Sequence, residues 1–166
     1  MSTAPLTWTV SLTAVDHPEA ATVLYEYIDE LASRYYGRQA TSEEIVAALG
    51  DGADLREPRG ALLVARDGAV PVGCVGLRWQ GAGLADGDAE LTRMFVRKAA
   101  RRGGAGARLV GAAEELARAC GAGRIRLNTR KDLVEAIALY GRLGYRPIDP
   151  YGDDPYAEVW LAKSLG

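Results

Sequence analysis

The stretch at residues 89–121 places a strand-like segment, a basic glycine-rich loop and a helix-like run directly after one another. Residues 89–96 favour a strand, residues 97–106 concentrate arginine and glycine, and the following run is rich in alanine and leucine. Glycines let the backbone come close to a ligand, and the start of a helix offers unpaired N–H groups at the positive end of its dipole. The stretch therefore predicts a site for a phosphate group.

Composition limits the remaining possibilities. The chain has 166 residues, 48% hydrophobic and 25% charged, which is typical of one soluble domain with its own core. A net charge of −2 argues against a general binder of nucleic acid or anionic membranes. Neither Cys74 nor Cys120 has a metal-type spacing, and the chain has one histidine. We expect a single domain over residues 1–166, cytoplasmic, without a metal, a nucleic-acid partner or a membrane partner, because no signal or spanning segment is seen.

Periodicity and capping residues predict the secondary structure. Asp16 with Glu19, and Thr41 with Glu44, have the spacing of capping boxes, and Asp67-Gly68 is a strong hairpin turn. Strands are predicted at 7–15, 60–66, 71–79, 89–96, 124–129, 145–148 and 157–162, and helices at 18–36, 41–49, 104–120 and 133–143. This order implies a mixed sheet with helices on its faces.

The helix at 104–120 has one apolar stripe, from which we expect the side that faces the core. The stripe consists of Leu109, Ala112, Ala113, Leu116 and Cys120. Glu114 and Arg118 are expected to pair on the outer side. Cys74 is expected inside a strand core, and His17 at the entry of the first helix.

Other phosphate-binding loops fit the glycines less well. A dinucleotide loop needs a third glycine, but Leu109 stands at that place, and the next strand ends in Asn128-Thr129 rather than in an acid. A Walker loop needs Gly-Lys followed by Ser or Thr, which the stretch lacks.

Two segments together resemble the GNAT acetyltransferase superfamily. Arg101, Gly104 and Gly106 match its acetyl-coenzyme A signature, in which an arginine or glutamine precedes a glycine by three residues. Residues 135–145 resemble a second motif, in which a helix carrying Tyr140 ends before a Gly-aromatic pair. Leu133 stands where many members have an asparagine. The resemblance covers most of the chain and implies an α/β (α+β) fold: a mostly antiparallel sheet of seven strands, helices on both faces, and strands four and five splayed.

The resemblance also implies residues that bind acetyl-coenzyme A. Main-chain groups of Met94, Phe95 and Val96 would hold the pantetheine arm in the manner of an added strand. Asn128 would line the opposite side of the splay, although it could also be an ordinary strand-end asparagine. The pyrophosphate would bind to backbone amides of the loop and helix start, formed by Arg101, Arg102, Gly103, Gly104, Ala105, Gly106 and Ala107.

Two residues are candidates for the chemistry. Tyr140 resembles the family tyrosine that gives a proton to the coenzyme sulfur and would also contact the coenzyme; it could otherwise be a core aromatic residue. Glu90 lies where some members place a catalytic glutamate, and it could take the amine proton or simply pair with Arg93.

The sequence thus predicts an acetyl-CoA-dependent N-acetyltransferase that acts by direct attack of a primary amine in a ternary complex. A small-molecule acceptor is favoured, and a homodimer is possible. The alternatives are a non-catalytic acyl-CoA sensor and a protein or peptide amine acetyltransferase.

Overall fold

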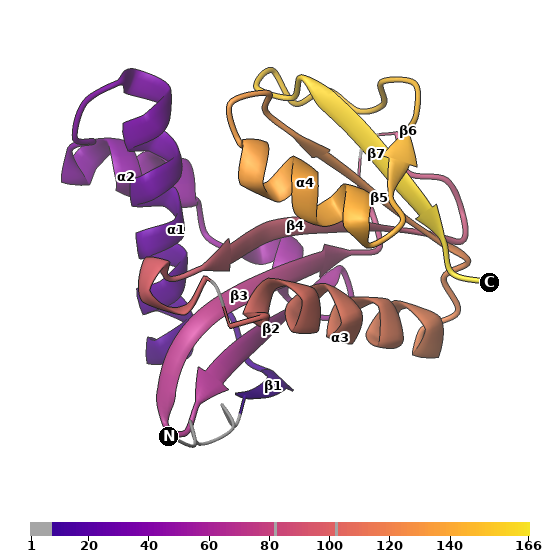
Figure 1. Cartoon of the computed structure of the whole chain (residues 1–166), viewed down its shortest axis with the longest axis horizontal. Coiled ribbons are helices and arrows are strands. Elements are labelled where there is room, and N and C mark those ends of the chain that lie inside the picture. The colour runs from indigo at the N-terminus through magenta and orange to yellow at the C-terminus, as the bar shows by residue number, and fades with distance from the viewer. Residues whose placement is uncertain (1–7, 82, 102) are drawn as a thin grey trace, which may run out of the picture.

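A seven-stranded sheet in the order β1-β2-β3-β4-β5-β7-β6 forms the centre of the computed structural model, which describes residues 8–81, 83–101 and 103–166 (Figure 1). The strands are β1 (Trp8–Leu12), β2 (Gly60–Asp67), β3 (Val70–Arg78), β4 (Asp88–Val96), β5 (Arg124–Thr129), β6 (Arg146–Pro147) and β7 (Val159–Ser164). The helices are α1 (Pro18–Tyr36), α2 (Ser42–Leu49), α3 (Ala105–Ala119) and α4 (Val134–Arg142), with short 3-10 turns η1 (Ala53–Leu55) and η2 (Lys98–Ala100).

The pairing of β4 with β5 is the exception in the sheet. The other neighbouring strands pair antiparallel, whereas β4 and β5 run parallel and are paired only from Asp88 opposite Arg124 to Glu90 opposite Arg126. Beyond Glu90 the two strands diverge (Figure 1). The predicted sheet, mixed and mostly antiparallel with splayed fourth and fifth strands, is confirmed.

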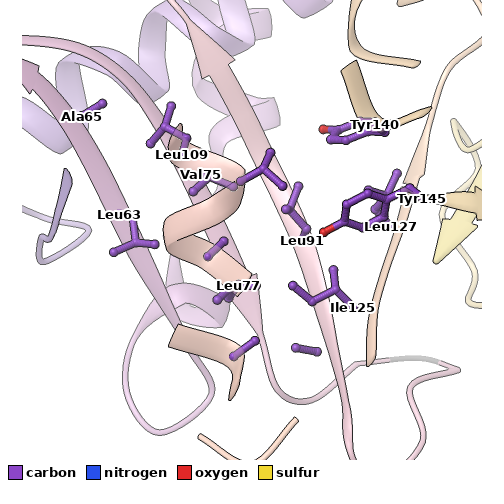
Figure 2. Packing of buried hydrophobic residues seen from close by; sticks show 14 of the residues in the cluster. Leu63, Ala65, Val75, Leu77, Leu91, Leu109, Ile125, Leu127, Tyr140 and Tyr145 are labelled. Carbon is purple, nitrogen blue, oxygen red and sulfur yellow. The ribbon is translucent and has the colours of Figure 1, made fainter. Parts of the chain in front are cut away.

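Alternating residues of β2 show how the two faces of the sheet are covered. Leu62 and Val64 pack in a cluster with residues of α1, whereas Leu63 and Ala65 belong to the larger cluster formed with α3 and α4 (Figure 2). Because side chains alternate along a strand, one strand supplies both cores. Helices therefore lie on both faces, as predicted.

A bulge changes the course of β4 shortly after it leaves β5. Arg93 and Met94 together oppose the single residue Val75 of β3, and Arg93 has a positive φ of 50°. An extra residue of this kind bends the strand and turns its side chains. As a result Arg93 reaches Asp54 of η1, at 2.9 and 3.2 Å, and not Glu90 as one alternative expected.

The first helix spans the predicted residues, but its N-cap differs from the expected one. His17, not Asp16, is the N-cap, and its Nδ1 accepts the N–H of Glu19 at 3.1 Å. The Glu19 carboxylate instead binds Arg66 at 2.5 Å, so a tertiary ion pair replaces the expected capping box. The capping box of Thr41 and Glu44 is present as predicted.

The orientation of α3 differs from the prediction at two positions. Glu114 is buried and bonded to Lys163, and Arg118 pairs with Glu115 rather than with Glu114. Cys120, expected in the core, is exposed because it caps the helix where α3 runs past the sheet. The buried stripe is instead Ala105, Leu109, Val110, Ala113, Glu114 and Ala117.

Strand ends also shift, because pairing rather than local pattern decides where a strand stops. β1 ends at Leu12, and β6 has only two residues opposite β7. In the described part of the chain, no helix is both long and apolar enough to cross a membrane.

Gly73 provides a test of how closely β3 and β4 approach each other. A Cβ at this position would collide with the carbonyl oxygen of Phe95. We expect Gly73→Ala to lower the free energy of unfolding by about 1–3 kcal/mol, the usual cost of overpacking. Urea denaturation measures the change.

Gly111 is the matched control, because it lies inside α3 with no atom within 4 Å of a built Cβ. Gly111→Ala should raise the unfolding free energy by up to about 1 kcal/mol, since alanine is the better helix former. Equal effects of the two substitutions would contradict the packing argument.

Candidate functional site

The divergence of β4 from β5 leaves two backbone edges without strand partners. Beyond Glu90 on β4 and Arg126 on β5, no pairing joins the two strands in the described structure. Each edge presents N–H and C=O groups that must find another partner. Met94, Phe95 and Val96 form the outer part of the β4 edge, and Asn128 lies on the β5 edge.

The start of α3 lies beside the end of β4 and offers free donors. Within the described residues, no backbone hydrogen bond uses the N–H of Gly104, Ala105, Gly106 or Ala107, and no side chain caps the helix. Gly104 has a φ of 83°, a left-handed conformation that favours glycine. These amides and the helix dipole suit an anion such as a pyrophosphate, which is the predicted role of this loop. Arg102 lies outside the described residues.

Gly106 brings three elements together at this point. A Cβ on Gly106 would lie 3.0 Å from Leu139 of α4 and 3.4 Å from Met94 of β4. The start of α3, the end of β4 and the middle of α4 therefore meet, and Tyr140 follows Leu139 directly. The structure thus places Tyr140 close to the predicted phosphate loop and the open β4 edge.

Tyr140 is the one buried residue of α4, with 4% of its surface exposed. Figure 2 shows its hydroxyl on the side of the ring that faces β4. Burial, with a smaller contribution from Tyr27, raises the pKa of the Tyr140 phenol, so that it stays protonated at neutral pH. Within the described residues no hydrogen bond occupies this hydroxyl, whereas the Tyr145 hydroxyl donates to Glu114.

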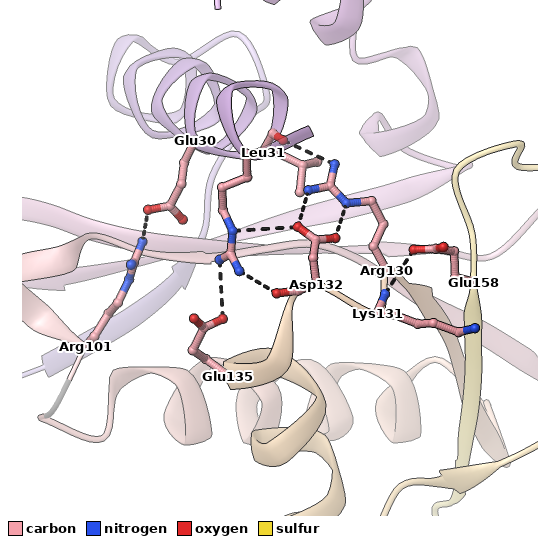
Figure 3. Close-up of polar contacts among 9 residues, drawn as sticks. Glu30, Leu31, Arg101, Arg130, Lys131, Asp132, Glu135 and Glu158 are labelled. Atoms are coloured by element: carbon pink, nitrogen blue, oxygen red, sulfur yellow. Dashed lines mark hydrogen bonds and ion pairs between the residues drawn. The ribbon is translucent and has the colours of Figure 1, made fainter. Parts of the chain in front are cut away.

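Helix α1 closes one face of the splay through ion pairs to the β4 arm. Glu26 accepts two hydrogen bonds from Arg97 at 2.6 and 2.9 Å. Glu30 pairs with Arg101 at 2.5 Å (Figure 3). Arg101 also donates to the carbonyl of Val96 at 2.8 Å. Its guanidinium therefore points back toward β4 and α1. At the start of α3 the backbone amides, and not this side chain, are placed to contact an anion.

The same helix reaches the β5 arm one turn further on. Arg34 donates to the carbonyl of Asp132 at 2.5 Å and to Glu135 at 3.3 Å, and Arg130 donates to the carbonyl of Leu31 at 3.2 Å (Figure 3). Because α1 contacts both arms, it fixes the width of the opening on its own face.

Phe95 belongs to this face as well. Its ring is buried in the α1 cluster and packs edge-on against Tyr27, with centroids 6.0 Å apart. The side chain therefore has a structural role, and only the main chain of Phe95 faces the open edge.

Glu90 lies at the point where β4 and β5 part, with 3% of its surface exposed. One carboxylate oxygen is ion-paired with Arg78 opposite it on β3, and the other accepts the Tyr151 hydroxyl at 2.8 Å. Glu90 lies on the α1 side of the sheet and Tyr140 on the α3 side, so the two candidates approach the splay from opposite faces.

A chain of alternating charges continues on both sides of Glu90. Arg78 also approaches Asp54 at 3.5 Å, and burial alone would raise the pKa of Asp54, but Arg93 and Arg78 together lower it. On the other side, Arg126 covers the Tyr151 ring at 3.8 Å and pairs with Asp88 at 2.9 Å. Burial, followed by the nearby Glu90 charge, raises the pKa of Tyr151.

This network was not predicted from the sequence. Tyr151 lies in a turn-rich loop 61 residues beyond Glu90, and nothing in its local pattern distinguishes it from a loop tyrosine. The sequence carried one signal for this network, the alternation Arg124-Ile125-Arg126-Leu127-Asn128. It places the polar side chains of this strand, including Arg126, on one face.

A cleft of about 590 Å³ lies at the outer end of β5. It is lined by Arg34, Tyr35, Arg130, Asp132, Pro155, Tyr156 and Glu158. In this lining the rings of Tyr35 and Tyr156 pack edge to face, with their centroids 5.3 Å apart. Trp79 lines a different cleft, beside Cys120. Among the described residues, no three His, Cys, Asp or Glu side chains come together as a metal site.

The Arg78–Glu90 pair gives a testable prediction. Arg78→Met leaves the buried Glu90 carboxylate without its cation, and we expect the free energy of unfolding to fall by roughly 3 kcal/mol. This loss of unfolding free energy is at the lower end of the range for a broken buried ion pair, because 31% of the Arg78 side chain is exposed to water. Chemical denaturation of Arg56→Met, which breaks the exposed pair with Asp16, is the control and should show little change. Similar losses in both variants would show that Glu90 is not specially dependent on Arg78.

Comparison with known proteins identifies the family and supports the fold. The sequence pattern of the acetyltransferase (GNAT) family matches residues 24–145. The IAA acetyltransferase of Azospirillum brasilense is 37% identical over 143 residues, which are 84% of this chain and 89% of that protein. A GNAT-family acetyltransferase from Staphylococcus aureus has the same fold, with a TM-score of 0.75 at 17% identity over 96% of this chain and 100% of that chain. The PaiA N-acetyltransferase of Thermoplasma acidophilum, in complex with coenzyme A, has a TM-score of 0.71 at 16% identity. The match covers 95% of this chain and 99% of that chain. The chain therefore belongs to the GNAT family and is an acetyl-CoA-dependent N-acetyltransferase.

Proposed function

We propose that the enzyme transfers acetyl from acetyl-CoA to a primary amine of a small molecule, by direct attack in a ternary complex. The observation that carries the proposal is the meeting of three features at Gly106. They are the amides at the start of α3, which have no partner among the described residues, the open edge of β4, and α4 with Tyr140. One extended ligand with a phosphate end, an amide-bearing arm and a thioester matches all three.

The coenzyme would lie along β4 from the phosphate loop toward the parting of the strands. Its pyrophosphate would accept hydrogen bonds from the amides of residues 104–107, while Arg101 stays with Glu30 and Val96. The pantetheine amides would pair with the main chain of Met94 and Val96 as an added strand. Asn128 would border the arm on the β5 side.

Tyr140 would serve the departing sulfur. The amine nitrogen forms a bond to the acetyl carbon, the carbon–sulfur bond breaks, and the amine loses a proton while the thiolate gains one. A protonated phenol beside the sulfur stabilises the developing thiolate by a hydrogen bond and supplies its proton. Burial keeps this phenol neutral, and its hydroxyl is not engaged elsewhere in the described structure.

The cysteines support direct attack rather than an acetylated enzyme. Burial raises the pKa of Cys74 to about 12, so its thiolate is scarce at neutral pH, and its thiol donates to the carbonyl of Arg93. Cys120 caps the far end of α3, away from the phosphate loop. Neither cysteine is suited to carry an acetyl group between the substrates.

Two features support a small acceptor. The cleft beside Tyr35 and Tyr156 opens at the outer end of β5, where an amine could approach the strands. The Azospirillum relative is named for acetylation of IAA, which is a small molecule. We propose an amine for this chain because an amine becomes a good nucleophile on losing one proton, which a side chain or water can accept.

Tyr140→Phe is the direct test of the proposed chemistry. With the amine that releases coenzyme A fastest in a panel, kcat should fall about 10²-fold, the contribution expected of an acid catalyst. The KM for acetyl-CoA should change little. Because the Tyr140 pKa lies above its usual value, the loss should be equal at each pH from about 6 to 9. Tyr25→Phe, an exposed position on α1, is the control. An unchanged kcat in Tyr140→Phe would exclude the phenol as donor.

Glu90 would act as base or anchor through the Tyr151 hydroxyl, because its own oxygens are held by Arg78 and Tyr151. We expect Glu90→Gln to depress acetylation most at low pH, where the amine is protonated and most in need of a base. Tyr151→Phe should reproduce the same profile of rate against pH. A profile of unchanged shape in both variants would remove Glu90 and Tyr151 from the chemistry and leave them a structural role.

A further inference from the structure

A buried ion pair holds the middle of α3 against β7, away from the phosphate loop. Lys163 of β7 donates to both carboxylate oxygens of Glu114 at 3.0 Å, and 7% of the Glu114 surface is exposed. A pair of this kind adds little to stability, because the cost of removing both charges from water offsets their attraction. Its position suggests another use.

The same carboxylate accepts the hydroxyl of Tyr145 at 3.0 Å. Tyr145, 2% exposed, follows α4 after Gly144, whose φ of 97° turns the chain back toward the helix. Burial, then the Glu114 charge, raises the pKa of Tyr145, so its phenol remains a donor to Glu114. A hydrogen bond to a charged acceptor is roughly twice as strong as one between neutral groups.

Tyr145 contacts Tyr140 in two ways. Its backbone N–H donates to the carbonyl of Tyr140 at 3.0 Å. The two rings pack at a centroid distance of 5.7 Å with a 60° tilt, side by side in Figure 2. A shift of the Tyr145 ring would therefore move both the last turn of α4 and the Tyr140 ring.

We propose that Glu114, held by Lys163, is a positioning residue that sets the place of the Tyr140 hydroxyl through Tyr145. The inference rests on the proposed donor role of Tyr140. Helix α4 has nine residues and no side-chain cap, so it depends on tertiary contacts for a fixed position. An error of about 1 Å in the place of a catalytic group can cost about 10²-fold in rate. One helix, α3, then fixes both the phosphate end and the sulfur end of the coenzyme.

The test removes the tether with the smallest possible changes. Tyr145→Phe deletes only the hydroxyl, and Glu114→Leu deletes the acceptor. We expect each to lower kcat about 10-fold, with the KM for acetyl-CoA changed less than about twofold. Glu114→Gln keeps an oxygen that accepts the hydroxyl and should restore most of kcat. Glu115→Leu, exposed on the outer side of α3, is the matched control and should keep full activity.

A double-mutant cycle separates positioning from general damage. In a Tyr140→Phe background, Tyr145→Phe should cost less than twofold in kcat, because the group that it positions is already gone. The same 10-fold loss in both backgrounds would overturn the proposal.

Aromatic carbon–proton NMR of tyrosine-labelled protein gives a second readout that needs no acceptor. The Tyr140 signals are those missing in Tyr140→Phe, and they should shift or broaden in Tyr145→Phe and Glu114→Leu but not in Glu115→Leu. Unmoved signals would overturn the positioning role even if a variant loses activity or stability. If Tyr140→Phe keeps full kcat, the donor assignment fails, while the NMR result still decides whether Glu114 holds the ring.

Discussion

The rest of the structure depends on a parallel strand pair that stops after three residues. β4 and β5 are joined only from Asp88 to Glu90, and each then continues with one unpaired backbone edge. Buried backbone groups without partners are costly, so an opening of this kind must be filled by a ligand or by water. Beyond the last paired residue, Glu90, the bulge at Arg93 bends β4 along its open edge.

Elements on the two faces of the sheet hold this opening in place differently. On one face, α1 spans both arms with exposed or half-exposed ion pairs, such as Glu30 with Arg101 and Arg34 with Glu135, which are individually weak and easily exchanged. On the other face, α3 and α4 meet through buried contacts around Gly106 and Tyr145. The face of α3 and α4 carries Tyr140 and the helix start predicted to bind the coenzyme, and the face of α1 borders the cleft lined by Tyr35 and Tyr156.

The sequence was sufficient wherever a short local pattern decides the structure. The boundaries of the strand at 124–129 and the capping box of Thr41 and Glu44 follow from alternation and from a three-residue spacing, and both are present. The prediction was wrong where a distant residue competes for the same group. Glu19 binds Arg66 instead of forming the predicted capping box. Glu114 faces inward because Lys163 and Tyr145 supply hydrogen-bond donors there. A helical stripe alone does not show that a buried charge has partners on another strand.

By itself the sequence determined the family and the order of the elements. It also predicted the phosphate loop, because glycines before a helix start have a physical meaning that needs no distant contact. Only the tertiary structure decided the surroundings of Glu90 and Tyr140. Glu90 is bonded to Arg78 and Tyr151. Tyr140 lies on the opposite face and packs against Tyr145, whose hydroxyl donates to Glu114. These partners come from strands and loops remote in sequence, and the ionisation and reach of a buried group are set by the neighbours that folding brings to it.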